Sequence, residues 1–183
     1  MRVISGVKKG FKLAAGNTGK IRPTTARTRK VIFDVLGEKI RESNVLDVFA
    51  GSGSLGIEAL SRGAAKVTFI EKSRYAISIL RENLQKTGFQ SEAVIFSSPA
   101  DLAFKTLARS TFKFDLIFAD PPYHQSLAQS TISAVEEYDL LVNEGWLILE
   151  HSKRNESELS VVHMNLAKRK KQGETLVSFY RHV

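Results

Sequence analysis

Short apolar segments alternate with amphipathic helical segments along most of this 183-residue chain. The apolar segments have the length of buried strands, and the segments between them have the spacing of helices that bury one face. Such an alternation predicts a mostly parallel sheet that is covered by helices on both faces. Ligands bind to such sheets beyond the carboxyl ends of the strands, where the winding reverses. The expected strands are 45–49, 66–70, 93–96, 114–119 and 145–150, and the expected helices are 26–40, 73–87, 99–108 and 126–137, with another that ends near 61.

Both ends of the chain are expected to form hairpins. Residues 1–13 carry apolar side chains interrupted by lysines and glycines, which is typical of a short basic β-hairpin. Residues 161–171 and 174–181 form the expected C-terminal antiparallel hairpin, which completes a seven-stranded sheet. Its run of cations, 168–171, is interpreted as a solvated edge where lysines block strand pairing, with RNA contact as the alternative. The expected units are a hairpin extension and one main domain, at 1–20 and 21–183.

A glycine-rich loop, residues 50–56, follows the strand 45–49 and leads into a helix. Glycines let a ligand approach the backbone closely at the helix N-terminus. Glu71 ends the next strand, 20 residues beyond Gly51, where an acid can accept hydrogen bonds from ribose hydroxyls. Asp47, just ahead of the glycines, adds an acceptor for a cationic amine. We expect a nucleoside-bearing cofactor here; the alternative is a tight turn with a surface glutamate.

The sequence Asp120-Pro121-Pro122-Tyr123 directly follows the apolar segment 114–119. Consecutive prolines end the strand and prevent an immediate helix, because each has a fixed φ and lacks an N–H group. The resulting corner presents the Asp120 carboxylate and the Pro121 carbonyl as acceptors, beside the aromatic face of Tyr123. Acceptors next to a stacking surface suit a planar group that carries an NH2, such as a nucleobase. The alternative is a proline-rich turn without a ligand.

The charge of the chain favours a polyanionic partner. Lysine and arginine number 27 against 19 acids, which gives a net charge of +8 and favours nucleic acid. The cations Arg22, Arg27, Arg29 and Lys30 cluster at the start of the expected helix 26–40, where the helix dipole does not favour positive charge. Either phosphate binding or a solvated helix face would explain this cluster. The absence of cysteine excludes disulfides and thiolate metal sites and favours the cytoplasm. The histidines lack ligand spacing, so no metal is expected, and no apolar run is long enough to span a membrane.

With both motifs in place, the chain resembles the Rossmann-like S-adenosylmethionine-dependent methyltransferases. Residues 47–53 are similar to their cofactor loop, and residues 120–123 resemble the [D/N]-P-P-[Y/F] motif of the amino-methylating groups. The stretches 2–6, 22–25 and 178–181 further resemble the bacterial 16S rRNA guanine-N2 methyltransferase family. The resemblance implies methyl transfer from S-adenosylmethionine to the exocyclic N2 of a guanine in 16S rRNA. It also implies action on the small ribosomal subunit or its assembly intermediate, and a monomer is expected as the simplest oligomeric state.

The residues and the resemblance together give three groups of expected site residues. The expected catalytic residues are Asp120, Pro121 and Tyr123. The expected cofactor-binding residues are Asp47, Phe49, Gly51, Ser52, Gly53, Glu71 and Ala100. The expected RNA-binding residues are Arg2, Lys8, Lys9, Arg22, Thr24, Arg27 and Arg29.

The chain departs from the family pattern at two positions. Lys30 stands where the family has an acid, and Pro99 stands before Ala100 where many relatives have Asp or Asn. Adenine recognition is therefore expected to fall to a backbone group or to Asp101. The alternatives are a DNA adenine-N6 methyltransferase, which needs an added recognition domain, a glutamine-N5 methyltransferase, an NAD dehydrogenase, and a non-catalytic RNA-binding or ribosome-assembly factor on the same fold.

Overall fold

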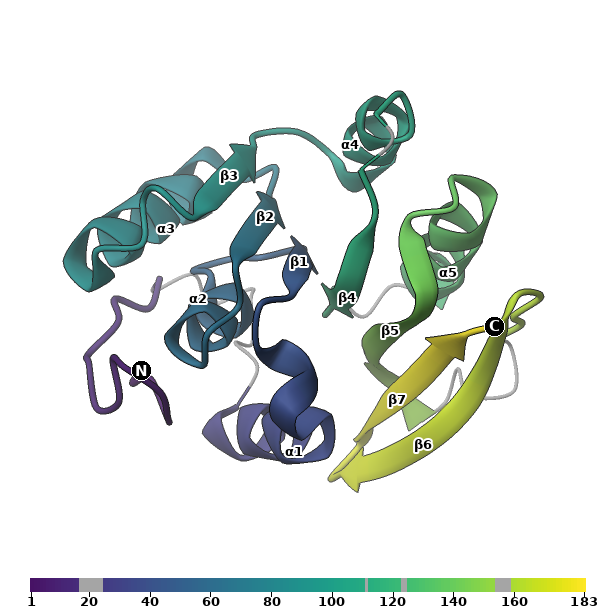
Figure 1. Ribbon diagram of the computed structural model, residues 1–183, viewed down its shortest axis with the longest axis horizontal. Helices are drawn as coiled ribbons and strands as arrows, with labels where there is room; N and C mark the ends of the chain where they lie inside the picture. Colours follow the sequence, from purple (N-terminus) through teal and green to yellow (C-terminus); the bar gives the residue numbers. More distant parts are fainter. Residues whose placement is uncertain (17–24, 111, 123–124, 154–158) are drawn as a thin grey trace.

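A seven-stranded sheet with strand order β3-β2-β1-β4-β5-β7-β6 forms the centre of the computed structural model (Figure 1). The structure describes residues 1–16, 25–110, 112–122, 125–153 and 159–183. Strands β1 to β5 are parallel, whereas β7 is antiparallel to both β5 and β6. The expected Rossmann-like α/β fold with a C-terminal antiparallel hairpin is thereby confirmed. The strands are β1 Asn44–Val48, β2 Lys66–Ile70, β3 Ala93–Phe96, β4 Phe114–Ala119, β5 Leu141–Ser152, β6 Met164–Gln172 and β7 Thr175–His182.

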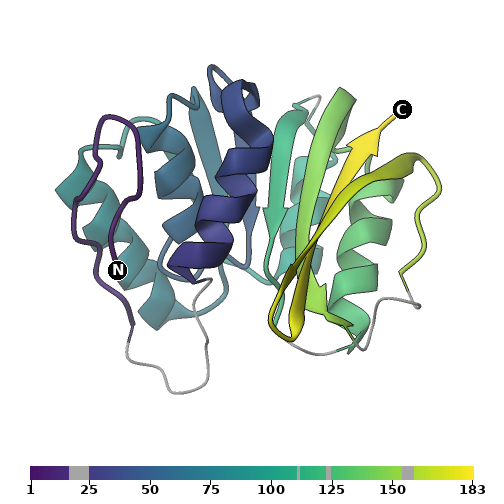
Figure 2. The same cartoon turned by 90° about the horizontal axis from the view of Figure 1, so that it is seen from below.

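Helices cover both faces of the sheet (Figure 2). The helices are α1 Ala26–Leu36, α2 Ser54–Ser61, α3 Arg74–Thr87, α4 Ala100–Leu107 and α5 Gln125–Glu137. The first α-helix is shorter than expected because Gly37 adopts a left-handed φ of 54°, after which a 3-10 turn, Gly37–Ile40, completes the segment. None of the helices in the described parts of the chain is long and apolar enough to cross a membrane.

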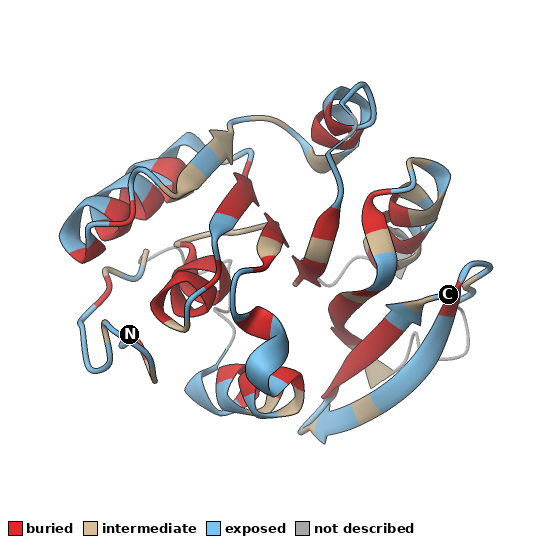
Figure 3. Ribbon diagram, in the orientation of Figure 1, coloured by how far each residue is buried: buried red, intermediate tan, exposed pale blue. Residues whose placement is uncertain are grey.

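Two buried clusters hold these layers together. On one face, Phe33 of α1 packs against Phe118 of β4, with a ring-centroid distance of 5.7 Å, in a cluster that includes residues of α2 and α3. On the other face, Phe104 of α4 and Ile132 of α5 pack against the opposite side of the strands. The central strands are therefore buried on both faces (Figure 3). This explains why they appear in the sequence as continuous apolar runs rather than as alternating patterns.

The N-terminal segment folds back on itself and packs against α2. Its two arms meet at one antiparallel bridge, Arg2 with Lys12, so the expected hairpin has little regular strand. The buried carboxylate of Glu58 accepts hydrogen bonds from the backbone N–H groups of Ile4 and Ser5, at 2.7 and 3.0 Å. These contacts tie the segment to the main domain.

The winding of the sheet reverses between β1 and β4. Chain order runs from β1 to β2 and β3 on one side, and resumes with β4 on the other. The two strands pair in parallel, with Val48 opposite Ala119 at their carboxyl ends. The glycine loop after β1 and the Asp120 corner after β4 therefore lie next to each other. This is the reversal point at which such sheets bind ligands.

Candidate active site

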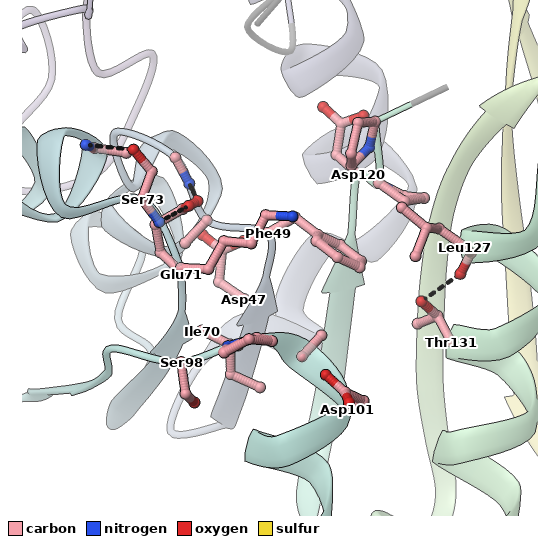
Figure 4. Close-up of a pocket in the computed structure, with 18 of the residues that line it drawn as sticks. Asp47, Phe49, Ile70, Glu71, Ser73, Ser98, Asp101, Asp120, Leu127 and Thr131 are labelled. Atoms are coloured by element: carbon pink, nitrogen blue, oxygen red, sulfur yellow. Dashed lines mark hydrogen bonds between the residues drawn. The ribbon is translucent and has the colours of Figure 1, made fainter. Parts of the chain in front are cut away.

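A cavity of about 960 Å³ lies at the carboxyl ends of the strands. Known ligand pockets measure roughly 300 to 1,000 Å³, so this cavity has room for a nucleoside cofactor and a second group. Most of the expected cofactor-binding residues and both described residues of the expected catalytic group line it (Figure 4). These residues are Asp47, Phe49, Gly51, Ser52, Glu71, Ala100, Asp120 and Pro121.

The glycines of the loop have different physical roles. Gly51 has a left-handed φ of 55° and open space around it, as expected for close approach of a ligand. Gly53, which precedes α2, does not line the cavity; a Cβ there would lie 2.3 Å from Leu80 Cδ1. Gly56 lets α2 pack tightly on β2, since a Cβ would lie 2.3 Å from the ring of Phe69. Gly53 therefore has a packing role, and its expected contact with the cofactor stays a prediction.

Glu71 braces the cofactor loop from β2. Its Oε2 accepts a hydrogen bond from the backbone N–H of Gly51, and its Oε1 accepts one from Ser73, both at 2.8 Å. The side chain is buried, so these charge-assisted bonds fix the loop against the start of α3. Each carboxylate oxygen keeps a second lone pair, which leaves Glu71 able to accept from a ribose hydroxyl.

Asp47 is buried beneath the loop and accepts a hydrogen bond from the Gly56 N–H at 2.9 Å. Burial raises the pKa of Asp47 to about 7, the Gly56 hydrogen bond opposes this shift, and the charges of Asp120 and Glu71 add to it. Carboxyl groups from β1, β2 and the end of β4 thus act on one another across the cavity. Their combined field favours a cationic ligand.

Phe49 adopts a backbone conformation that is rare for its residue type. Its φ is 62°, in the left-handed region, which costs on the order of 1–3 kcal/mol for a residue with a side chain. In the view of Figure 4 its ring lies between Asp120 and Asp101, over the cavity. Backbone strain of this kind concentrates at ligand-binding sites.

Asn83 is a site residue that the sequence analysis missed. It is fully buried on α3, and its Nδ2 donates to the carbonyl oxygens of Ser52 and Ala14 at 2.9 and 3.0 Å. Its Oδ1 accepts from the Ala14 N–H at 2.7 Å. The next residues, Ala15 and Gly16, line the cavity. An asparagine on the apolar stripe of the helix 73–87 was the only signal of this role in the sequence.

One expected RNA contact, Arg29, needs correction, and another, Lys8, lies away from the cavity and stays a prediction. Arg29 has only 1% of its surface exposed and donates through Nη2 to the Arg2 carbonyl at 2.9 Å, so it is not available to a phosphate. Burial lowers the pKa of Arg29, and the charge of Glu58 opposes that shift. The Nζ atom of Lys8 lies 5.8 Å from the ring centroid of Phe89, which follows the C-terminal end of α3. The cavity lies at the other end of this helix, so the turn that contains Lys8 is remote from it.

The other expected RNA-binding residues are placed as follows. Lys9 is exposed on the same remote turn as Lys8. Arg2 is exposed but donates to the Gly10 carbonyl at 2.7 Å. Arg27 is exposed in the first turn of α1, at the cavity end of the sheet (Figure 2). Arg22, Thr24 and the expected catalytic residue Tyr123 lie outside the described residues. Within the described ranges, no group of three or more His, Asp or Glu side chains could hold a metal ion.

Comparison with known proteins identifies the family. The sequence model of the family described as conserved hypothetical protein 95 matches residues 1–181. The ribosomal RNA small subunit methyltransferase D of Haemophilus influenzae is 40% identical over 147 residues, which cover 80% of this chain and 73% of that protein. Its Escherichia coli counterpart is 33% identical over 181 residues, covering 99% of this chain and 89% of that protein. The chain belongs to the 16S rRNA methyltransferase family.

The fold of the family agrees with this assignment. The solved structure of yhhF from Escherichia coli, provisionally described as a methyltransferase, is 34% identical and has a TM-score of 0.86. The match covers 100% of this chain and 97% of that one. The resemblance inferred from the cofactor loop and the Asp120 corner is therefore confirmed over nearly the whole chain.

Proposed function

We propose that this protein transfers a methyl group from S-adenosylmethionine to the exocyclic N2 of a guanine in 16S ribosomal RNA. The observation that carries the proposal is the pairing of β1 with β4, which brings the glycine loop and the Asp120 corner to one cavity. The names of the curated relatives support RNA of the small subunit as the substrate. The proposed activity belongs to the cytoplasm, because that is where bacterial ribosomal RNA is found.

The described residues fit S-adenosylmethionine as the cofactor. Gly51 gives the ligand access to the backbone, and Glu71 offers acceptors for the ribose hydroxyls. The carboxyl groups of Asp47 and Asp120 favour a ligand with a cationic amine and a sulfonium. When bound, this cofactor would supply an electrophilic methyl group, whose bond to the sulfonium sulfur breaks as the bond to the guanine nitrogen forms, so that a neutral thioether leaves.

The proline corner prepares the guanine amine for reaction. An exocyclic amine is a poor nucleophile because its lone pair is delocalised into the ring. The Asp120 carboxylate and the Pro121 carbonyl accept its two N–H bonds, which localises the lone pair on nitrogen. The same acceptors stabilise the positive charge that develops as the N–C bond forms. The product ammonium is acidic, so its proton passes to solvent without a strong base. The base must leave its stack to reach this site.

Adenine recognition falls to the start of α4. Pro99 caps this helix and has no side-chain acceptor, whereas Asp101 lies in the first turn and lines the cavity. The first backbone N–H groups of a helix have no partners within it, so they are also available to a ring nitrogen. We propose that Asp101 accepts from the adenine amine in place of the acid or amide that many relatives carry before the alanine.

The proposal is tested by incubating the protein with methyl-labelled S-adenosylmethionine and small ribosomal subunits, total RNA or DNA, followed by nucleoside analysis. We expect label in N2-methylguanosine from 16S rRNA. Label in DNA or in N6-methyladenosine would instead support the alternative amino-methyltransferases. Cofactor binding without transfer to any substrate would favour a non-catalytic assembly factor.

A further inference from the structure

Strand β6 forms the outer edge of the sheet and is exposed along nearly its whole length (Figure 3). Met164 is its only buried residue. The strand carries the run of cations 168–171, and neither Lys168 nor Lys170 forms an ion pair with a described residue. These charges are the densest cationic stretch of the sequence, and the proposed mechanism does not use them.

The strand register places these cations level with the catalytic corner. Following the paired residues from Ala119 across β5 and β7 leads to Arg169 on β6. Lys170 follows Arg169 toward the same edge that Asp120 occupies after Ala119. Neighbouring strands lie about 4.8 Å apart, so three spacings put the backbones of Lys170 and Asp120 about 14 Å apart. In a duplex, each strand carries a phosphate about every 3.4 Å of axis, so one bound RNA spans this distance.

Lys168 and Lys170 lie on the α1 side of the sheet. They pair with Phe179 and Val177, and residues paired across antiparallel strands share a face. Those two partners belong to the core cluster beneath α1. Helix α1 begins at the same edge as the β6–β7 turn, and its first turn exposes Arg27 (Figure 2). Cations of β6 and of α1 therefore lie on the same face of the sheet, near the edge that holds the cavity.

The β6–β7 turn adds positive charge that exceeds the negative charge of the described acids beside it. Lys153, just after β5, lies 3.6 Å from the exposed carboxylate of Glu174. A side-chain hydrogen bond with Lys153 and the charge of that residue lower the pKa of Lys171. The exposed carboxylate of Glu174 thus acts on both Lys153 and Lys171, and Glu150, the other acid at this end of β5 that the structure describes, is buried. Like charges held together on an exposed turn favour an anionic partner.

Protection of an edge strand explains lysines on β6 but not this placement. Edge lysines prevent pairing with another sheet wherever they occur along the strand. Protection of the edge does not require the lysines to lie level with Asp120 or beside Lys153. The burial of Arg29 also leaves the substrate with one cationic contact fewer than the sequence predicts.

We propose that the α1-side face of β6 binds backbone phosphates of the same RNA whose guanine enters the cavity, through Lys168 and Lys170. This inference rests on the proposed function, since it assigns a second contact surface to that substrate. Phosphate contacts hold the register of the RNA and carry no sequence information.

The test compares Lys168→Gln/Lys170→Gln with the wild-type protein in methyl transfer to small-subunit RNA at several salt concentrations. The loss of two phosphate contacts is expected to raise KM for RNA about tenfold. It is also expected to reduce the slope of the logarithm of the RNA-binding constant against the logarithm of the salt concentration by about 1.5. The affinity for S-adenosylmethionine stays unchanged. Lys168→Arg/Lys170→Arg keeps both charges and is expected to behave as wild type.

The matched control is Arg41→Gln/Lys66→Gln, which removes equal charge from exposed positions near the amino ends of β1 and β2. An unchanged KM and salt slope in the β6 variant, or an equal change in the control, would overturn the inference. Filter binding of labelled small-subunit RNA separates this outcome from failure of the proposed function, because it needs no turnover. Wild-type binding that the β6 variant loses supports the inference even if no methyl group is transferred; equal binding by both proteins contradicts it.

Discussion

The Nδ2 atom of Asn83 lies 2.9 Å from the carbonyl oxygen of Ser52, so one buried amide on α3 holds the loop that faces the cavity. The same amide exchanges two hydrogen bonds with Ala14, which directly precedes the cavity-lining residues Ala15 and Gly16. Asn83 therefore links the end of the N-terminal segment directly to the cofactor loop. This arrangement gives the first of four predictions.

Replacing Asn83 by alanine is expected to weaken the binding of S-adenosylmethionine and to destabilise the fold. The variant leaves the Ser52 carbonyl and both backbone groups of Ala14 without this partner, at a cost of about 1–3 kcal/mol for each group that stays buried. Calorimetry measures the affinity, and urea unfolding measures the stability. Thr87→Val serves as the control, because its hydroxyl bonds only within α3. Equal affinities for both variants would refute the role of Asn83 in the site.

Glu71→Gln is expected to reduce the affinity for S-adenosylmethionine by about tenfold to a hundredfold, from the loss of charge-assisted hydrogen bonds. Glutamine has one carbonyl oxygen, so it cannot accept from both the Gly51 and Ser73 N–H groups in the present arrangement. Calorimetric titration gives the dissociation constant. Glu82→Gln on the exposed side of α3, where the acid pairs with Lys86, should bind the cofactor as the wild type does.

Asp120→Ala is expected to lower the rate of methyl transfer to RNA by about a hundredfold or more, the usual effect of removing a group that stabilises developing charge. Single-turnover kinetics with saturating RNA measures the chemical step. Cofactor binding should persist, because the loop and Glu71 are intact. Asp139→Ala, which removes an exposed acid paired with Lys113, is the control. Turnover close to that of the wild type would exclude the proposed role of the corner.

Stability is expected to depend on pH through Asp47. Its pKa is about 7 in the folded protein and near the ordinary 3.8 when unfolded, so the folded state holds an extra proton between these values. The free energy of unfolding therefore falls as pH rises from about 4 to 7, by on the order of 1.4 kcal/mol per pH unit from this group. Asp47→Asn keeps an acceptor for the Gly56 N–H and removes the titration.

Urea unfolding at pH 5, 6, 7 and 8 checks this prediction. The stability of Asp47→Asn relative to the wild type should increase between pH 5 and 7 and level off by pH 8. The exposed Asp34, which pairs with Lys30 at 2.6 Å, provides the control variant Asp34→Asn. A difference between Asp47→Asn and the wild type that does not change with pH would show that Asp47 is already ionised.

Much of the site could be predicted because its motifs are local. The loop at 50–56 and the corner at 120–123 are each built from consecutive residues whose backbone freedom depends on glycine or proline. Apolar periodicity located the strands before these motifs, and the parallel arrangement then required both to lie at one edge. Only the pairing of β1 with β4 remained open, and the structure confirms it.

The cationic contacts could not be predicted in the same way. Arg29 and Arg27 lie two positions apart in one helical turn, yet one is buried and the other exposed, because packing against the N-terminal segment covers only one of them. Asn83 and Ser52 are 31 residues apart and meet only when α3 packs beside the loop.

The sequence by itself determined the fold class, the family, and the two motifs of the active site, because periodicity and backbone stiffness act between near neighbours in the chain. The tertiary structure alone decided which charges are buried, which glycines serve packing, and which cations stand level with Asp120. Those properties depend on contacts and strand registers between segments that are distant in sequence.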